Sequence, residues 1–134
     1  MTAQAEREAV GTLLSGWVTT DVQWPNKAYT PKNGTSYTRV VLQAADGRQL
    51  EFGADKVVHR QPGILLLMVF WPADRGDAGG RTIADSLAAR FRRKRVEFTD
   101  GSILFRTPTI RAIGEDGAFY QFNVSVPFVR DNLF

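Results

Sequence analysis

The sequence lacks the residue types on which several kinds of function depend. It contains no cysteine and only one histidine, His59. Without cysteine there is no disulfide framework, zinc knuckle or thiol nucleophile, a composition that fits a reducing compartment. A lone histidine with no carboxylates at ligand spacing is more often structural than metal-binding or catalytic. The sequence therefore predicts no metal, no cofactor and no enzymatic activity.

A long hydrophobic segment is also missing. The longest apolar run extends over the eight residues from Ile64 to Trp71 and is bracketed by Pro62 and Pro72. A helix that crosses a bilayer needs roughly 20 apolar residues, so no membrane contact is expected. A short run between turn signals is typical of a strand covered on both faces, although a short buried helix has the same composition. We expect a central strand over residues 61–71.

Two segments have the spacing of amphipathic helices. Residues 3–19 place five apolar side chains on one face; these are Val10, Leu13, Leu14, Trp17 and Val18. Residues 77–93 carry a second stripe, made by Ile83, Leu87 and Phe91. At about 100° per residue, Lys94 and Arg95 would fall on that stripe, so the second helix should end near Arg93.

The remaining segments alternate as strands do. Asp46-Gly47 predicts a hairpin that joins strand 37–45 to strand 48–53. Further strands are expected near 96–98, over 102–113 and over 119–128, and Pro127 should end the last strand or place it at an edge. The order predicts an α+β fold over residues 1–134, a single domain with a mostly antiparallel β-sheet flanked by two α-helices.

A basic cluster follows the second helix. Residues 90–95 hold five of the 17 basic residues; these are Arg90, Arg92, Arg93, Lys94 and Arg95. One interpretation is contact with phosphate, as in nucleic acid. The other is a solvated helix end, where cations suit the negative pole of the helix dipole. The sequence alone leaves both interpretations open.

The connection between the first helix and the first strand is rich in large, stiff residues. The segment "WPNKAYTP" contains Trp24, Pro25 and Tyr29. It either covers apolar surface of the sheet as a strap or serves as an interface anchor, since rigid aromatic residues carry binding energy.

Several of these pieces occur in an order that resembles a known family. A leading helix runs into "WPNKAYTP"; the strands "YTRVVL" and "RQPGILLLMVFWP" follow, then the helix "IADSLAARFR" and the ending "GAFYQFNVSVPF". This order resembles the phage tail terminator-like proteins of tailed phages and prophages, over about residues 5–129. The resemblance implies a structural protein of the virion tail that is made in the host cytoplasm. It also implies a ring, usually of six subunits, that caps the tail tube, ends its polymerisation and docks the head connector.

The implied ring suggests which residues meet a neighbour. Head-to-tail contacts close a ring, and a sheet edge can make them by strand addition. We expect the subunit interface to include Trp24, Pro25, Tyr29, Pro127 and Phe134. The basic cluster would contact passing DNA if it faced the lumen. The alternatives are a head–tail joining protein, and a small nucleic-acid-binding domain that uses residues 90–95.

Overall fold

The computed structural model describes residues 3–31, 34–44, 48–49, 58–73 and 76–133. Two helices and eight strands follow in the order α1 (Ala3–Leu13), β1 (Asp21–Gln23), β2 (Tyr37–Ala44), β3 (Arg48–Gln49), β4 (Val58–Pro72), α2 (Ala78–Phe91), β5 (Arg95–Phe98), β6 (Gly101–Phe105), β7 (Thr109–Asp116) and β8 (Phe119–Leu133). The predicted α+β class is confirmed, and among the described strands only β1 and β2 pair in parallel.

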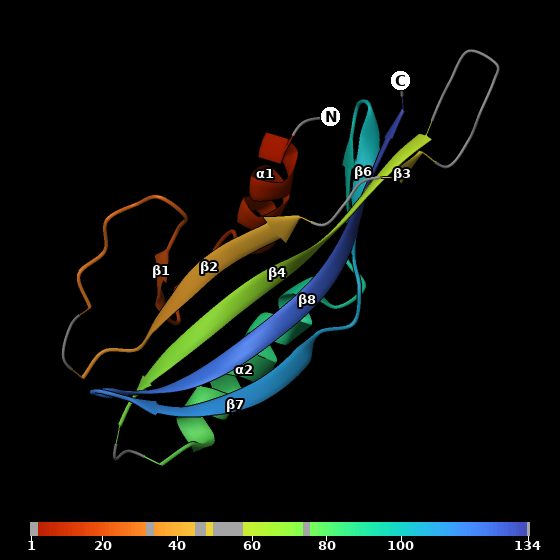
Figure 1. Cartoon of the computed structure of the whole chain (residues 1–134). Helices are drawn as coiled ribbons and strands as arrows, with labels where there is room; N and C mark the ends of the chain where they lie inside the picture. The colour runs from red at the N-terminus through yellow and green to blue at the C-terminus, as the bar shows by residue number, and fades with distance from the viewer. Residues whose placement is uncertain (1–2, 32–33, 45–47, 50–57, 74–75, 134) are drawn as a thin grey trace.

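Two long strands form the centre of the sheet. β4 and β8 pair antiparallel over their whole length, from Val58 opposite Leu133 to Pro72 opposite Phe119. On its other side, β4 pairs with β3 at residues 59–60 and with β2 at residues 63–70. On its other side, β8 pairs with β7 at residues 119–125 and with β6 at residues 128–132. Figure 1 shows the resulting curled sheet, in which β2, β4, β8 and β7 lie side by side. The predicted central strand is therefore confirmed.

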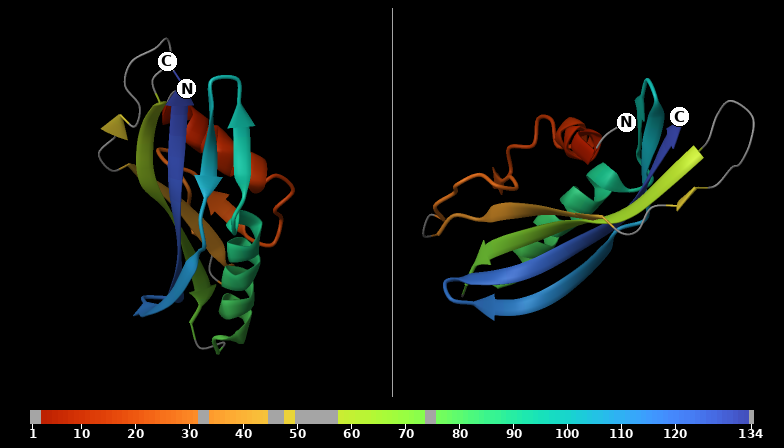
Figure 2. Two further views of the ribbon diagram at one scale, coloured as in Figure 1. Left: turned by 90° about the vertical axis from the view of Figure 1, so that its right-hand side faces the viewer. Right: turned by 45° about the horizontal axis from the view of Figure 1, so that its top comes forward.

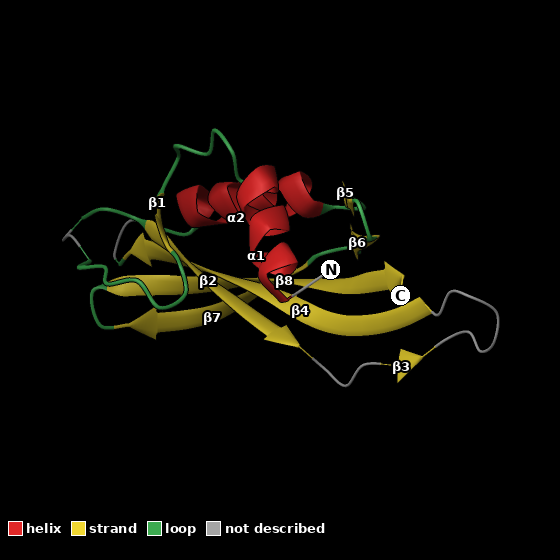
Figure 3. Ribbon diagram, turned by 90° about the horizontal axis from the view of Figure 1, so that it is seen from above, coloured by secondary structure: helices red, strands yellow, loops and turns green. Residues whose placement is uncertain are grey.

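Both helices lie on the same face of the sheet (Figures 2 and 3). Alternate residues of β4 and β8 point into the layer between sheet and helices, and they are fully buried: Leu65, Leu67, Val69, Phe122, Val124 and Val126. The stripe predicted for α2 fills the same layer, since Leu87 and Phe91 are completely buried. The helix packs closely because Gly80 has no side chain; a Cβ atom there would lie 2.4 Å from Cε2 of Phe122.

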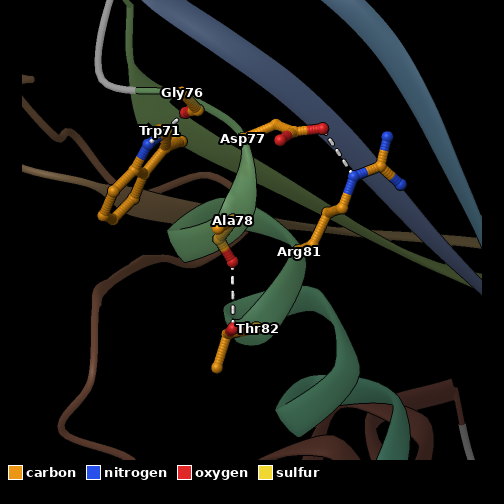
Figure 4. Close-up of polar contacts among 6 residues, drawn as sticks. All are labelled: Trp71, Gly76, Asp77, Ala78, Arg81 and Thr82. Carbon is orange, nitrogen blue, oxygen red and sulfur yellow. Dashed lines mark hydrogen bonds and ion pairs between the residues drawn. The ribbon is translucent and has the colours of Figure 1, made fainter.

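The start of α2 is fixed by local contacts (Figure 4). The indole Nε1 of Trp71 donates to the Gly76 carbonyl at 3.0 Å, which ties the preceding turn to the end of β4. Asp77 occupies the N-cap position without a side-chain cap bond; it accepts a hydrogen bond from Nε of Arg81 at 2.7 Å. This pairing lowers the pKa of the Asp77 carboxyl.

The first helix is shorter than its sequence pattern suggested. α1 ends at Leu13, and Gly16 adopts a φ of 80° beyond it. Val10 and Leu14 are buried as predicted, but Val18 is 91% exposed. The prediction of a helix to residue 19 was wrong, because a glycine with positive φ reverses the chain before the last turn can form.

Two strand predictions near prolines were wrong for different reasons. The expected strand 102–113 is broken into β6 and β7 at Pro108, which has no N–H for a ladder bond. β8, in contrast, continues through Pro127 to Leu133. The Pro127 carbonyl accepts from the Arg106 N–H at 2.8 Å, so its nitrogen faces the same side, in the gap between β7 and β6. No ladder bond to β4 is lost there.

The predicted hairpin around Asp46-Gly47 is not formed by the strands that the structure describes. Arg48 and Gln49 pair with Arg60 and His59 of β4, on the same side of β4 that β2 occupies. Residues 45–47 and 50–57, which include the predicted turn and most of the second arm, lie outside the described residues.

Candidate interaction surfaces

The face of the sheet opposite the helices is apolar along the central strand β4, whereas β8 presents Gln121, Asn123 and Ser125 there. We call it the open face; Figure 3 shows no helix on this side. Ile64 of β4 is 45% exposed and Ile113 of β7 is 51% exposed, while Leu66 and Met68 are half-buried. The expectation that the run Ile64–Trp71 is covered on both faces was therefore wrong. The side chains of this run that alternate toward the helices are covered within one chain, and on the open face Phe70 is also buried, stacked on Tyr37 with 4.6 Å between the ring centroids.

Polar and basic groups flank this apolar centre. The register places Arg39, Met68, Asn123 and Arg111 in one row across β2, β4, β8 and β7. Each end of the row carries a guanidinium. A shallow hollow of about 280 Å³ lies on the β7 side of this row, lined by Ile113, Asn123 and their neighbours.

Pro127 belongs to the open face. It lies opposite Ile64 in the register of β4 and β8, and its side chain is exposed. The sequence selected this residue as an interface candidate because a strand should end there, which it does not. Phe134, the other C-terminal candidate, lies outside the described residues.

The aromatic connection lies against the sheet. Trp24 is half-buried and packs on the core, and the guanidinium of Arg7 lies 3.5 Å from its ring centroid. The Tyr29 ring is 5.1 Å from that of Tyr37, and its hydroxyl donates to Asp21 at 2.9 Å. Burial and the nearby Asp21 carboxylate raise the pKa of Tyr29 to about 12. Pro25 is exposed at the rim. The segment therefore covers the sheet as a strap and leaves one rim accessible.

A groove runs beside this strap. We call it the β2 groove; it has a volume of about 500 Å³ and follows Val40, Val41 and Leu42 along the outer side of β2. Arg7 and Trp24 form part of its wall. Sequence analysis did not find this groove, because its wall combines residues from α1, β1 and β2 that are far apart along the chain.

The basic cluster separates into two parts. Nη1 of Arg90 donates to the carbonyls of Ser15 at 2.9 Å and Leu13 at 3.3 Å, and its guanidinium lies 5.2 Å from the Trp17 ring. Arg90 therefore holds the end of α1 against α2. The other four members are exposed: Arg92, Arg93, Lys94 and Arg95.

The exposed basic residues lie where α2 ends and β5 begins. The helix stops at Phe91, slightly before the predicted end, and Arg93 adopts a φ of 54° in the turn. Arg95 makes a long surface ion pair with Glu97 at 4.0 Å, which contributes little to stability. Arg93 and Arg106 together line a hollow of about 390 Å³. This end of the molecule is suited to an anionic partner.

One buried ion pair lies away from these surfaces. Nη1 of Arg130 in β8 approaches Oε1 of Glu6 in α1 at 3.3 Å, and both side chains are almost fully buried. Burial raises the pKa of Glu6, and the positive charge of Arg130 opposes this rise. The pair joins α1 to the sheet, and nothing about its position suggests contact with a substrate.

Within the described ranges, no three histidine, cysteine or acidic side chains come together in a way that could hold a metal ion. The described helices include none with the length and apolar character needed to cross a membrane.

Comparison with known proteins decides the family. Residues 7–128 match the family described as phage tail terminator protein. The chain belongs to the phage tail terminator family. Eight chains of solved structures also match this terminator. One of them has 22% sequence identity to this chain and a TM-score of 0.74, with 97% of this chain and 96% of that chain covered. This likeness supports the fold alone. No curated protein matches the sequence.

Membership confirms the resemblance drawn from the order of sequence motifs. The terminator is a structural protein of the phage tail, and its family implies association with other tail or head proteins of the virion.

Proposed function

We propose that this chain caps the end of the tail tube as a ring, ends tube polymerisation and presents the docking surface for the head connector. The observation that carries the proposal, beside family membership, is the open face. Along β4 it carries neighbouring apolar side chains that are only partly covered within one chain, Ile64, Leu66 and Met68. Contiguous exposed apolar surface on a small protein usually marks an interface.

The shape of the sheet supports a head-to-tail contact between subunits. A ring closes when one surface of a subunit meets a different surface of the next. The open face and the helix-covered face are two such surfaces, apolar with basic edges on one side and polar helix exteriors on the other. Pro127, beside Ile64, and the exposed Pro25 lie on accessible surface; with Trp24, Tyr29 and Phe134 they remain proposed interface residues.

Deletion of the gene from its phage or prophage, followed by electron microscopy of the tails, tests this function. Overlong tubes without heads are expected, and restoration of the gene should restore normal length. Tails of normal length without heads would instead assign the chain to head–tail joining. Normal, headed and infectious particles would contradict both roles.

A second candidate function is contact with DNA, supported by the exposed residues Arg92, Arg93, Lys94 and Arg95. In a ring that DNA passes through, these side chains would face the lumen. Replacement of Arg92 and Arg93 by Glu should then reduce DNA passage and infectivity, while replacement of both by Lys, which keeps the positive charge, should not. A small nucleic-acid-binding domain would further require tight, salt-dependent DNA binding by the free chain. Binding that does not change with salt would exclude phosphate as the ligand.

A further inference from the structure

The β2 groove follows an unpaired strand edge. β1 pairs with β2 only at residues 37–39. Among the strands that the structure describes, none pairs with residues 40–44 on the side of β2 away from β4. The segment "VVLQA" has no charge, proline or bulge, the features with which proteins usually protect an edge from pairing.

The edge of β7 shows the contrast. It also lacks a partner on its outer side in the described part of the sheet. However, it carries Arg111 at its middle, and its ladder is interrupted by an irregularity between Ala112 and Gly114. Both features discourage strand addition. These two unpaired stretches of strand edge therefore differ, and of the two the one on β2 is open to a further strand.

The groove is electrostatically one-sided. Its wall contains two guanidiniums, from Arg7 and Arg39, and no carboxylate. The Arg7 guanidinium is held on the Trp24 ring, and Nε of Arg39 donates to Oε1 of Gln23 at 3.0 Å. Both cations are thus oriented by neighbours that do not neutralise their charge. A guanidinium presented in this way is suited to a carboxylate.

We infer that the β2 groove binds an extended acidic segment of another polypeptide of the tail. The segment adds to residues 40–44 as a strand, and its carboxylates lie against Arg7 and Arg39. A phosphate would satisfy the two cations but would leave the main-chain donors and acceptors of the strand edge unused. This inference rests on the proposed function, because the partner is met on the assembled tail.

Hydrogen exchange on assembled tails tests the strand addition. Amide exchange of residues 40–44 is measured by mass spectrometry for the free chain and for the chain on purified tails. We expect exchange to slow by at least about tenfold on tails, because newly paired amides open rarely. Nuclease treatment should leave this protection in place. Unchanged exchange, or protection lost with nuclease, would overturn the inference.

Chemical cross-linking tests the acidic partner. Arg7→Lys and Arg39→Lys keep the charge and supply amines that a zero-length carbodiimide joins to a carboxylate in direct contact. We expect cross-links from these positions to an Asp or Glu of a second polypeptide, and none to a second polypeptide from the matched variant Arg81→Lys, which lies outside the groove and beside Asp77 of its own chain. Cross-links that join only residues of this chain would refute an acidic segment of another tail polypeptide as the occupant of the groove. Absence of the chain from purified tails is a separate result, which would refute the proposed function.

Discussion

Gly63 allows the close packing of the two long strands, β4 and β8. It lies opposite Phe128, and a Cβ atom at position 63 would lie 2.5 Å from Cζ of Phe128 and 2.7 Å from the Gln43 carbonyl oxygen. The aromatic ring could turn away, but the carbonyl belongs to the paired strand β2 and has little freedom. The position therefore requires glycine for space.

Gly63→Ala should destabilise the fold by about 1–3 kcal/mol, the usual cost of overpacking. Gly11→Ala is the matched control, since the added Cβ would meet only the flexible end of Arg7 at 3.0 Å. That change should be neutral or stabilise α1 by up to about 1 kcal/mol. Urea unfolding of the two variants measures both effects. Equal stability of the two would contradict the close packing at Gly63.

The buried pair of Glu6 and Arg130 predicts a second effect at single residues. Arg130→Met leaves the Glu6 carboxylate buried without a counter-charge, which should cost about 3–5 kcal/mol near neutral pH. The double variant Glu6→Leu/Arg130→Met should recover most of this loss. Urea unfolding of both variants measures the difference, and a double variant as unstable as the single one would show that the charge is not the cause.

The pH dependence of this site has a definite sign. Burial raises the pKa of folded Glu6 above its ordinary value of 4.5, so the folded state binds the proton more tightly than the unfolded state. The favourable contribution from protonation is fully present below 4.5 and is lost as pH rises through the folded pKa. The stability loss of Arg130→Met should therefore be smaller near about pH 4 than at neutral pH. Equal losses at both values would contradict a buried ionised Glu6.

At the scale of the elements, Arg90 links the two helices. Its contacts with the Leu13 and Ser15 carbonyls satisfy acceptors at the end of α1 that have no partner within the helix. Arg90→Gln should lower stability by about 1–2 kcal/mol, within the range for a cation at a helix C-terminus. Arg92→Gln is the matched control at an exposed position and should change stability by less than about 0.5 kcal/mol. Thermal unfolding compares them; equal effects would show that Arg90 is only part of the basic surface.

The helices and strands also show where apolar sequence patterns are enough to predict the fold. The stripe Ile83, Leu87 and Phe91 located α2 within a few residues, because a helix packed on a sheet needs one apolar side. The period-2 pattern of β8 predicted its buried face, from Phe122 to Phe128, because successive strand residues point to opposite sides. Patterns failed where the outcome depends on neighbouring strands. Pro127 is tolerated inside β8 only because β7 and β6 leave a gap beside it.

The candidate sites were harder to predict than the fold. Residues 90–95 read as one basic cluster, yet Arg90 faces α1 while its neighbours face solvent. The β2 groove leaves no local signal, since Arg7 and Arg39 are separated along the chain and meet only after folding. The order of motifs did identify the family, because it samples the whole chain and not one site.

At the scale of the whole molecule, helices cover one face of the sheet, and no helix in the described part of the chain covers the open face. A sheet with helices on one face buries Leu65, Leu67 and Val69 of the apolar run, and on the open face it leaves Ile64, Leu66 and Met68 partly exposed for a partner. Assembly on a tail would cover these exposed side chains, as a closed ring provides each subunit with the same neighbour. The open face is thus the feature that connects the fold to the proposed role.

Tail length after complementation of the gene deletion with Ile64→Glu tests this connection most directly. The residue is 45% exposed, so the isolated variant should keep its stability within about 0.5 kcal/mol. Thr99→Glu, at an exposed position between β5 and β6, adds the same charge away from the open face and the β2 groove and serves as the control. We expect overlong, headless tails with Ile64→Glu and normal tails with Thr99→Glu. Headed tails of normal length that carry the Ile64→Glu protein would contradict a role of the open face in capping the tube.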